Sequence, residues 1–140
     1  MTMPVITGID HVQVAVPACA EDRCRAFYVD LLGLPELPKP PILAARGGIW
    51  VQAGAQQLHL GVEAEFKPAR KAHPAFSTED ITAFAQRVRA ASYDVAWDET
   101  DPSVRRFFTH DPFGNRLEFV DAGLADGSGK SRSSTVSQSA

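Results

Sequence analysis

The chain has 140 residues, a formal net charge of −3 at pH 7 and 44% hydrophobic residues, and its basic and acidic side chains are interspersed. This length and apolar content predict one domain of ordinary size. Because no basic stripe and no apolar run of roughly 20 residues is present, we expect a small-molecule ligand, no nucleic acid and no membrane. Without a signal-peptide pattern the cytoplasm is the expected location, where both cysteines would be reduced.

The first predicted strand covers residues 9–16, where apolar and other side chains alternate with the period of a β-strand. Its valines share one face, whereas His11 and Gln13 lie on the opposite face. A helix over about 20–32 is predicted next, because apolar residues recur there at helical spacing and Gly33 then ends the pattern.

The segment from Pro35 to Gly48 carries four prolines, at positions 35, 38, 40 and 41. Prolines make such a loop semi-rigid, so it is either a wall or lid beside a cavity or a plain connector. Strand alternation returns at residues 57–61, with two leucines on one face and His59 on the other.

The second half of the chain repeats this order. Residues 72–77 read as a strand whose one face carries His73. A capping sequence then opens a helix over about 79–92, which has a single apolar stripe. The run Asp-Pro-Phe-Gly-Asn at 111–115 favours a hairpin turn. In the strand that follows, Glu118 points away from its two apolar neighbours.

Four potential metal ligands thus recur at nearly the same interval in the two halves: His11, His59, His73 and Glu118. Each lies on the strand face opposite the main apolar stripe, as expected of a sheet covered by helices on one face. Duplicated halves with two ligands each indicate one divalent ion held between them. Nitrogen and carboxylate donors suit zinc, iron, nickel or manganese better than calcium. The alternative is four unrelated polar residues.

The sequence resembles the vicinal oxygen chelate superfamily of glyoxalases, bleomycin-resistance proteins, fosfomycin-modifying enzymes and extradiol dioxygenases. The resemblance spans roughly residues 6–121, and its most specific parts are Asp10-His11-Val12, Leu58-His59-Leu60, Ala72-His73-Pro74 and the run from Asp111 to Glu118. It implies an α/β (α+β) fold in which two βαβββ modules form an open half-barrel cup.

The expected organisation is a single glyoxalase-like domain over residues 1–121, with module one at about 6–62 and module two at about 71–121. Residues 122–140 are rich in glycine and serine and are expected to be a flexible tail. A two-fold homodimer is also implied, because small family members commonly complete or bury their cups in this way.

The resemblance implies a metal-dependent lyase or isomerase, since the family's metal positions match His11, His59, His73 and Glu118 one for one. An octahedral ion with four protein ligands keeps two positions for neighbouring oxygens of a small substrate. Its Lewis acidity would stabilise an enediolate-type oxyanion. Glu118 could leave the ion and serve as the catalytic base, as in glyoxalases.

Two alternatives stay open. Glyoxalases often carry glutamate or glutamine at the position of His59, and dioxygenases use no ligand there. Without His59, the remaining two histidines and glutamate equal the facial triad of non-haem iron dioxygenases. His110 could be proposed as the base of such an enzyme, although a surface role fits it better.

A metal-free binding protein of the bleomycin-resistance kind is the other alternative. Fosfomycin modification is disfavoured, because Phe108 and Gly127 replace the tyrosine and arginine of those enzymes.

Three further residues are expected to contact the substrate. If the turn at 111–115 joins paired strands, Phe108 lies across from Glu118, and Arg106 lies two residues further along the same face. The Arg106 guanidinium would then project into the cup, where it suits a carboxylate or phosphate, unless it is a solvated strand-edge arginine. Gln13, beside His11, is a candidate hydrogen-bonding group.

Overall fold

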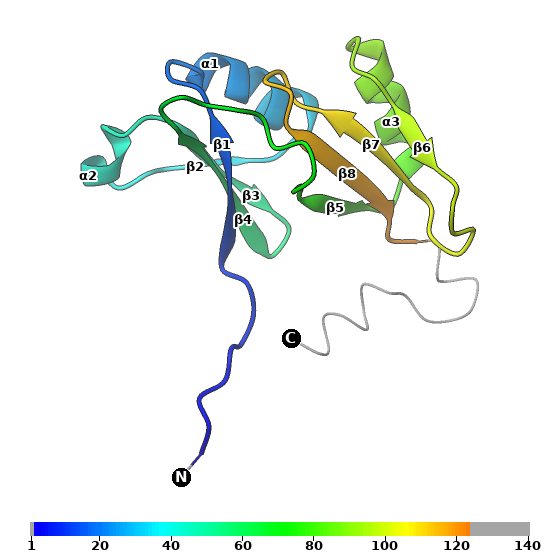
Figure 1. The fold of residues 1–140 in the computed structure, drawn as a ribbon, viewed down its shortest axis with the longest axis horizontal. Coiled ribbons are helices and arrows are strands. Elements are labelled where there is room, and N and C mark those ends of the chain that lie inside the picture. Colours follow the sequence, from blue (N-terminus) through cyan, green and yellow to red (C-terminus); the bar gives the residue numbers. More distant parts are fainter. Residues whose placement is uncertain (1, 124–140) are drawn as a thin grey trace.

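The computed structural model describes residues 2–123 of the chain, which fold into two four-stranded sheets, one in each half (Figure 1). The elements of the first half are β1 (His11–Val16), α1 (Glu21–Cys24), η1 (Arg25–Leu31), β2 (Glu36–Leu37), α2 (Pro41–Ala44), β3 (Ile49–Ala53) and β4 (Gln56–Val62). Those of the second half are β5 (Ala75–Thr78), α3 (Ile81–Ala90), β6 (Ala96–Asp98), β7 (Arg106–His110) and β8 (Arg116–Asp121).

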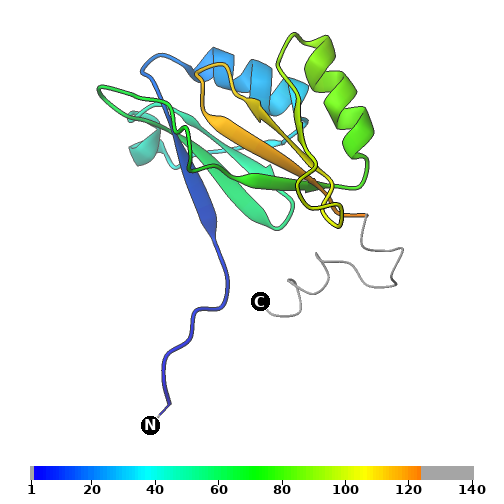
Figure 2. The same cartoon turned by 45° about the vertical axis from the view of Figure 1, so that its right-hand side comes forward.

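The two sheets have the same topology, with strand orders β1-β4-β3-β2 and β5-β8-β7-β6. In each, the first strand runs parallel to the last, and the remaining pairs are antiparallel. Each half therefore contains strand, helix and three strands, which confirms the predicted α+β fold of two βαβββ modules. Figures 1 and 2 show α1 and α3 together on one side of the two sheets.

The two long helical segments match the sequence predictions closely. The first begins as α1 and continues without a break as η1, a π-helical stretch that ends where Gly33 takes a φ of +80°. There the Leu34 amide donates to the Tyr28 carbonyl oxygen at 3.0 Å, which satisfies one of the last free carbonyls of the helix. The second, α3, is capped by the Asp80 side chain, which accepts from the Ala83 amide.

One hydrophobic core runs through both halves under the helices. It includes Phe27 and Tyr28 from the first half and the stacked pair Phe107 and Phe119 from the second, whose ring centroids are 5.0 Å apart. Phe27 also meets Tyr93 edge to face at 4.8 Å. The modules are therefore joined by a shared apolar interior, and relative motion between them would expose it to water.

A buried polar cluster of Tyr28, Asp111 and Asn115 adds a second connection between the halves. The Tyr28 hydroxyl donates to Asp111 at 2.7 Å, and the Asn115 amide group donates to the Ala15 carbonyl oxygen at 2.9 Å. The Asp111 carboxylate also accepts from the Asn115 backbone amide within its own turn. Burial and this carboxylate raise the pKa of Tyr28 well above its ordinary value, so its proton stays in the hydrogen bond.

Three sequence predictions need correction or fall outside the described chain. The proline-containing segment 35–48 is not all loop, because β2 and the one-turn helix α2 form within it. The strand predicted over 72–77 begins only at Ala75, so His73 lies in the connection before β5. The predicted tail, 122–140, lies outside the described residues from position 124 onward. Both cysteines are free, and Cys24 is buried, as expected.

None of the helices in residues 2–123 is long and apolar enough to cross a membrane.

Candidate metal centre

Glu118 and His73 form a close pair in the second module. Strand alternation along β8 sends Leu117 and Phe119 into the core, and Glu118 to the opposite face, where its side chain is 8% exposed. The Glu118 Oε1 lies 2.9 Å from the His73 Nε2. The His73 Nδ1 lies 2.8 Å from the Lys71 carbonyl oxygen, a contact that orients the ring. This leaves Nε2 directed at the carboxylate.

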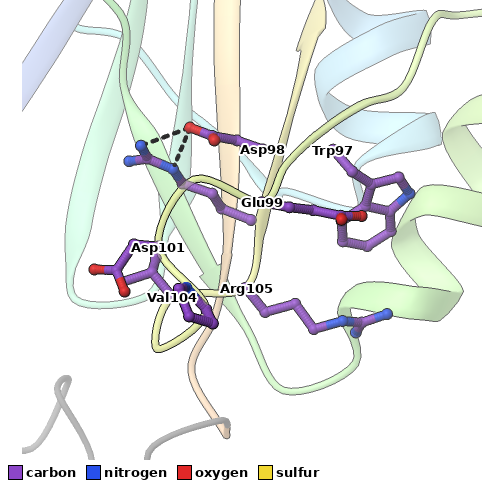
Figure 3. A pocket seen from close by; sticks show the side chains of 8 residues that line it. Trp97, Asp98, Glu99, Asp101, Val104 and Arg105 are labelled. Carbon is purple, nitrogen blue, oxygen red and sulfur yellow. Dashed lines mark hydrogen bonds and ion pairs between the residues drawn. The ribbon is translucent and has the colours of Figure 1, made fainter.

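The second oxygen of Glu118 faces Arg106 on β7. The Arg106 Nη1 is 3.4 Å from Glu118 Oε2, while its Nη2 and Nε lie 2.7 and 3.1 Å from Asp98 Oδ2. The dashed lines in Figure 3 end on this Asp98 carboxylate. Hydrogen bonds from Thr100 and then from Arg106 lower the pKa of Asp98 to about 2. The guanidinium expected to bind a substrate anion is thus already paired with two carboxylates of the protein.

Phe108 lies directly across from Glu118 in the β7–β8 pair, as predicted. Its ring meets the His73 imidazole edge to face at 5.4 Å. The guanidinium carbon of Arg116 stands 4.0 Å from the ring centroid, and that of Arg106 stands 5.5 Å away. An aromatic face between two cations is favourable for both, so Phe108 is held in place beside the His73–Glu118 pair.

His11 and His59 form a second pair, in the first module. Their rings are stacked with centroids 4.1 Å apart, and Trp50 stacks on the His59 ring at 4.0 Å. The His11 Nδ1 lies 2.9 Å from Asp10 Oδ2, which leaves its Nε2 open, whereas the His59 Nε2 faces the Gln57 Oε1 at 2.9 Å. Burial and then the neighbouring His11 lower the pKa of His59, which favours the neutral form that a metal ligand needs.

Gln13 occupies the same face of β1 as His11, and it pairs with His59 in the β1–β4 register. Its side chain lies over Gly61, where an added Cβ would come within 2.6 Å of the Gln13 Cδ. The missing side chain at Gly61 therefore provides the room for Gln13 on this face.

The structure brings the four predicted ligands together as two pairs, not as one cluster. Within the described residues, no group of three or more histidine, cysteine, aspartate or glutamate side chains could hold a metal ion. Two cavities have volumes of about 490 and 670 Å³. The smaller is formed by the β6–β7 loop and Arg106 (Figure 3), and the larger lies between the modules. None of the four side chains lines either.

The chemistry of each pair suits a divalent ion. In His11 and in His73, Nδ1 faces an oxygen acceptor, which is the usual outer-shell support of a metal-binding imidazole, and Nε2 is left as the donor atom. The His73 Nε2 and Glu118 Oε1 are 2.9 Å apart, so both atoms would be available to one ion bound at this pair. The Nε2 of His59 faces Gln57, which is not one of the four predicted ligands, whereas the Nε2 of His73 faces Glu118, which is; His59 therefore fits less directly.

Trp50 and Asp98 are neighbours of the site that sequence reasoning missed. Trp50 could have been found, because the hairpin around Gly54 places it opposite His59 in the β3–β4 register. Asp98 ends a strand of only three residues, and no pattern marks its contact with Arg106.

The comparisons with known proteins converge on one family. The sequence model of the Glyoxalase/Bleomycin resistance protein/Dioxygenase superfamily matches residues 8–119. A glyoxalase family protein from Bacillus anthracis has a similar structure, with a TM-score of 0.82 and 47% identity over 85% of this chain and 98% of its own. No curated protein sequence matches significantly.

More distant structures share the fold. A lactoylglutathione lyase from Agrobacterium tumefaciens has a TM-score of 0.65 and 21% identity, over 82% of this chain and 93% of its own. A genomically encoded fosfomycin resistance protein from Listeria monocytogenes has a TM-score of 0.67 and 13% identity, over 83% of this chain and 93% of its own.

Proposed function

The chain belongs to the Glyoxalase/Bleomycin resistance protein/Dioxygenase superfamily, and from this premise we propose that it is a metal-dependent enzyme of glyoxalase type. Its substrate would be a small molecule with two neighbouring oxygen atoms, and its reaction a lyase or isomerase step. The observation that carries the proposal is the His73–Glu118 pair, with His73 oriented through its Nδ1 and both reactive atoms 2.9 Å apart.

His11, His73 and Glu118 would hold the ion, with His59 as a fourth ligand. A divalent ion bound there would supply Lewis-acid polarisation of two adjacent substrate oxygens. The buried Glu118 would take up and return a substrate proton at Oε1, while Arg106, anchored by Asp98, keeps Oε2 in position. Phe108 and Trp50 would limit access of water, and Gln13 would orient the substrate by hydrogen bonding.

We propose that two copies of the chain complete this site. One chain offers two ligand pairs, and no larger group forms among its described residues. In the proposed two-fold dimer, the first module of each copy would face the second module of the other, so that each of two equivalent sites would receive four ligands. We therefore include a homodimer with shared sites in the proposed function.

The direct test is metal analysis of the purified protein after incubation with Zn²⁺, Ni²⁺, Mn²⁺ or Fe²⁺. The wild-type chain should bind one ion per chain, and His73→Ala and Glu118→Gln should each lose it while keeping the wild-type circular dichroism. His110→Ala is the matched control, since His110 is exposed and pairs only with Asp94 among the described contacts. Equal metal content in all four proteins would refute the proposed site. Loss of 2-oxoaldehyde–thiol turnover should accompany loss of the ion.

A non-haem iron dioxygenase is the second candidate, because the His59 Nε2 faces Gln57 and its ring is covered by Trp50. If His59 is no ligand, His11, His73 and Glu118 form the facial triad of such enzymes. Catechol cleavage that requires Fe²⁺ and oxygen, with His59→Ala retaining metal, would favour this candidate. If the chain bound bleomycin without any metal ion, the alternative of a binding protein would be favoured.

A further inference from the structure

The segment before β1, residues 2–10, is a largely exposed apolar arm, of which Gly8 and Ile9 line a groove of the same chain. Met3, Val5, Ile6 and Ile9 all lie in this arm, and each is between 64% and 93% exposed. Figures 1 and 2 show the arm running away from both sheets. Four large apolar side chains exposed in nine residues are an unusual loss of hydrophobic burial, which a partner surface would recover.

An apolar groove of about 670 Å³ begins at the base of this arm, between the two modules. Its walls include Leu34 of the first half and Phe76 and Phe84 of the second, together with β5 from Ala75 to Thr78. Among the described strands, β5 is hydrogen-bonded only to β8, so its outer edge still offers backbone donors and acceptors. The groove thus presents both apolar side chains and a free strand edge.

The proposed shared site brings the arm of one copy to this groove of the other. His11 of one copy must approach His73 of the partner for the ligands to meet. Ile9 precedes His11 by two residues and Ala75 follows His73 by two, so each lies within about 7 Å of its ligand along an extended chain. Completion of the proposed metal site would therefore bring the base of the arm within reach of the partner's β5, which lines the groove.

We propose that the arm of each copy docks in the groove of a second copy, reciprocally across a two-fold axis. This inference rests on the dimer included in the proposed function and adds the contact that holds it together. Neither the arm nor the groove contains a predicted metal ligand, so the contact can be disrupted without altering the ligand set.

The test compares Ile6→Asp with Ile42→Asp by light scattering and sedimentation over a range of concentrations. Ile6 is exposed on the arm, and Ile42 is similarly exposed on α2, outside the groove. Ile6→Asp should raise the dimer dissociation constant at least about tenfold, as expected for loss of a central apolar contact. Ile42→Asp should leave it unchanged. If Ile6→Asp and the wild-type chain have equal masses at every concentration, the arm contact is wrong. If Ile6→Asp in that case still binds the ion, the proposed function is unaffected.

A cross-link identifies the partner of the arm. In a Cys19→Ser background, the pair Ile6→Cys and Ser77→Cys should be joined by a short bis-maleimide between chains, which gives a covalent dimer on a denaturing gel. A link within one chain would overturn the proposal, because the arm would then close on its own groove. A wild-type chain that is monomeric at micromolar concentration, with a groove that takes up an apolar dye, would overturn both the arm contact and the shared site.

Discussion

Asp98 controls the position of Arg106 from outside the ligand set. Its carboxylate accepts two hydrogen bonds from Arg106, whose third faces Glu118 at 3.4 Å. These contacts hold the guanidinium beside Glu118 and use three of its five N–H donors, so two remain for a substrate anion. Arg106 thus supports the Glu118 carboxylate, and its predicted contact with a substrate anion stays a prediction.

Asp98→Asn should change how stability depends on pH. The pKa of Asp98 is lowered from 3.8 to about 2 in the folded chain, so its charged form stabilises the fold above about pH 4, and this contribution is lost as the pH falls toward 2. The stability advantage of the wild-type chain over Asp98→Asn should thus shrink between pH 4 and pH 2. Urea unfolding across this interval measures it, with Glu99→Gln as the neighbouring control. If the difference in unfolding free energy between the wild-type chain and Asp98→Asn stayed constant from pH 4 to pH 2, the lowered pKa of Asp98 would be contradicted.

Gly48 is required where β3 begins. Its φ is +83°, and a Cβ added there would run into the backbone carbonyl oxygen of Leu60 on β4. Gly48→Ala should therefore cost about 2–4 kcal/mol of unfolding free energy, because strain and a backbone clash add. Gly54→Ala is the matched control: its φ is +61°, but nothing lies within 4 Å, so about 1 kcal/mol is expected. Equal losses in urea unfolding would show that the clash is relieved by a small shift.

The turn between β7 and β8 should contribute more to stability than an ordinary helix cap. Asn115 is 1% exposed, and its side chain donates to Ala15 and Asp111 and accepts from the Ala69 amide. Asn115→Ala leaves these groups buried without partners and should cost about 2–4 kcal/mol. Asp80→Ala, which removes only the N-cap of α3, should cost about 1 kcal/mol. The reverse order in urea unfolding would contradict the view that this turn joins the modules.

Strand alternation predicts most of the elements and the face on which Glu118 and His59 lie, because burial of one sheet face imposes a period of two. The same argument fails at His73, since Pro74 cannot donate to a ladder and the strand begins only after it. The alternation of side chains along a strand also does not predict how the two modules pack against each other. Their packing depends on contacts between residues far apart in sequence, such as Tyr28 and Asp111. The separation of the two ligand pairs therefore could not be predicted.

At the scale of the whole molecule, the two ligand pairs provide a decisive test of sharing between copies. His11→Ala damages only the first-module pair, and His73→Ala only the second-module pair. If each site combines the first module of one copy with the second module of the other, a dimer of the two variants contains one intact site and one site lacking both histidines. A site built within a single chain would be damaged in every copy.

Equal amounts of His11→Ala and His73→Ala should therefore be unfolded together, refolded and assayed for bound metal. Random pairing makes half of the dimers mixed, so the sample should recover about a quarter of the wild-type metal content, although neither variant alone binds the ion. Mixing His73→Ala with Glu118→Gln is the control, because both changes affect the same pair and no intact site can form. Metal recovery in the control, or none in the first mixture while mixed dimers are present, would exclude a site shared between two copies.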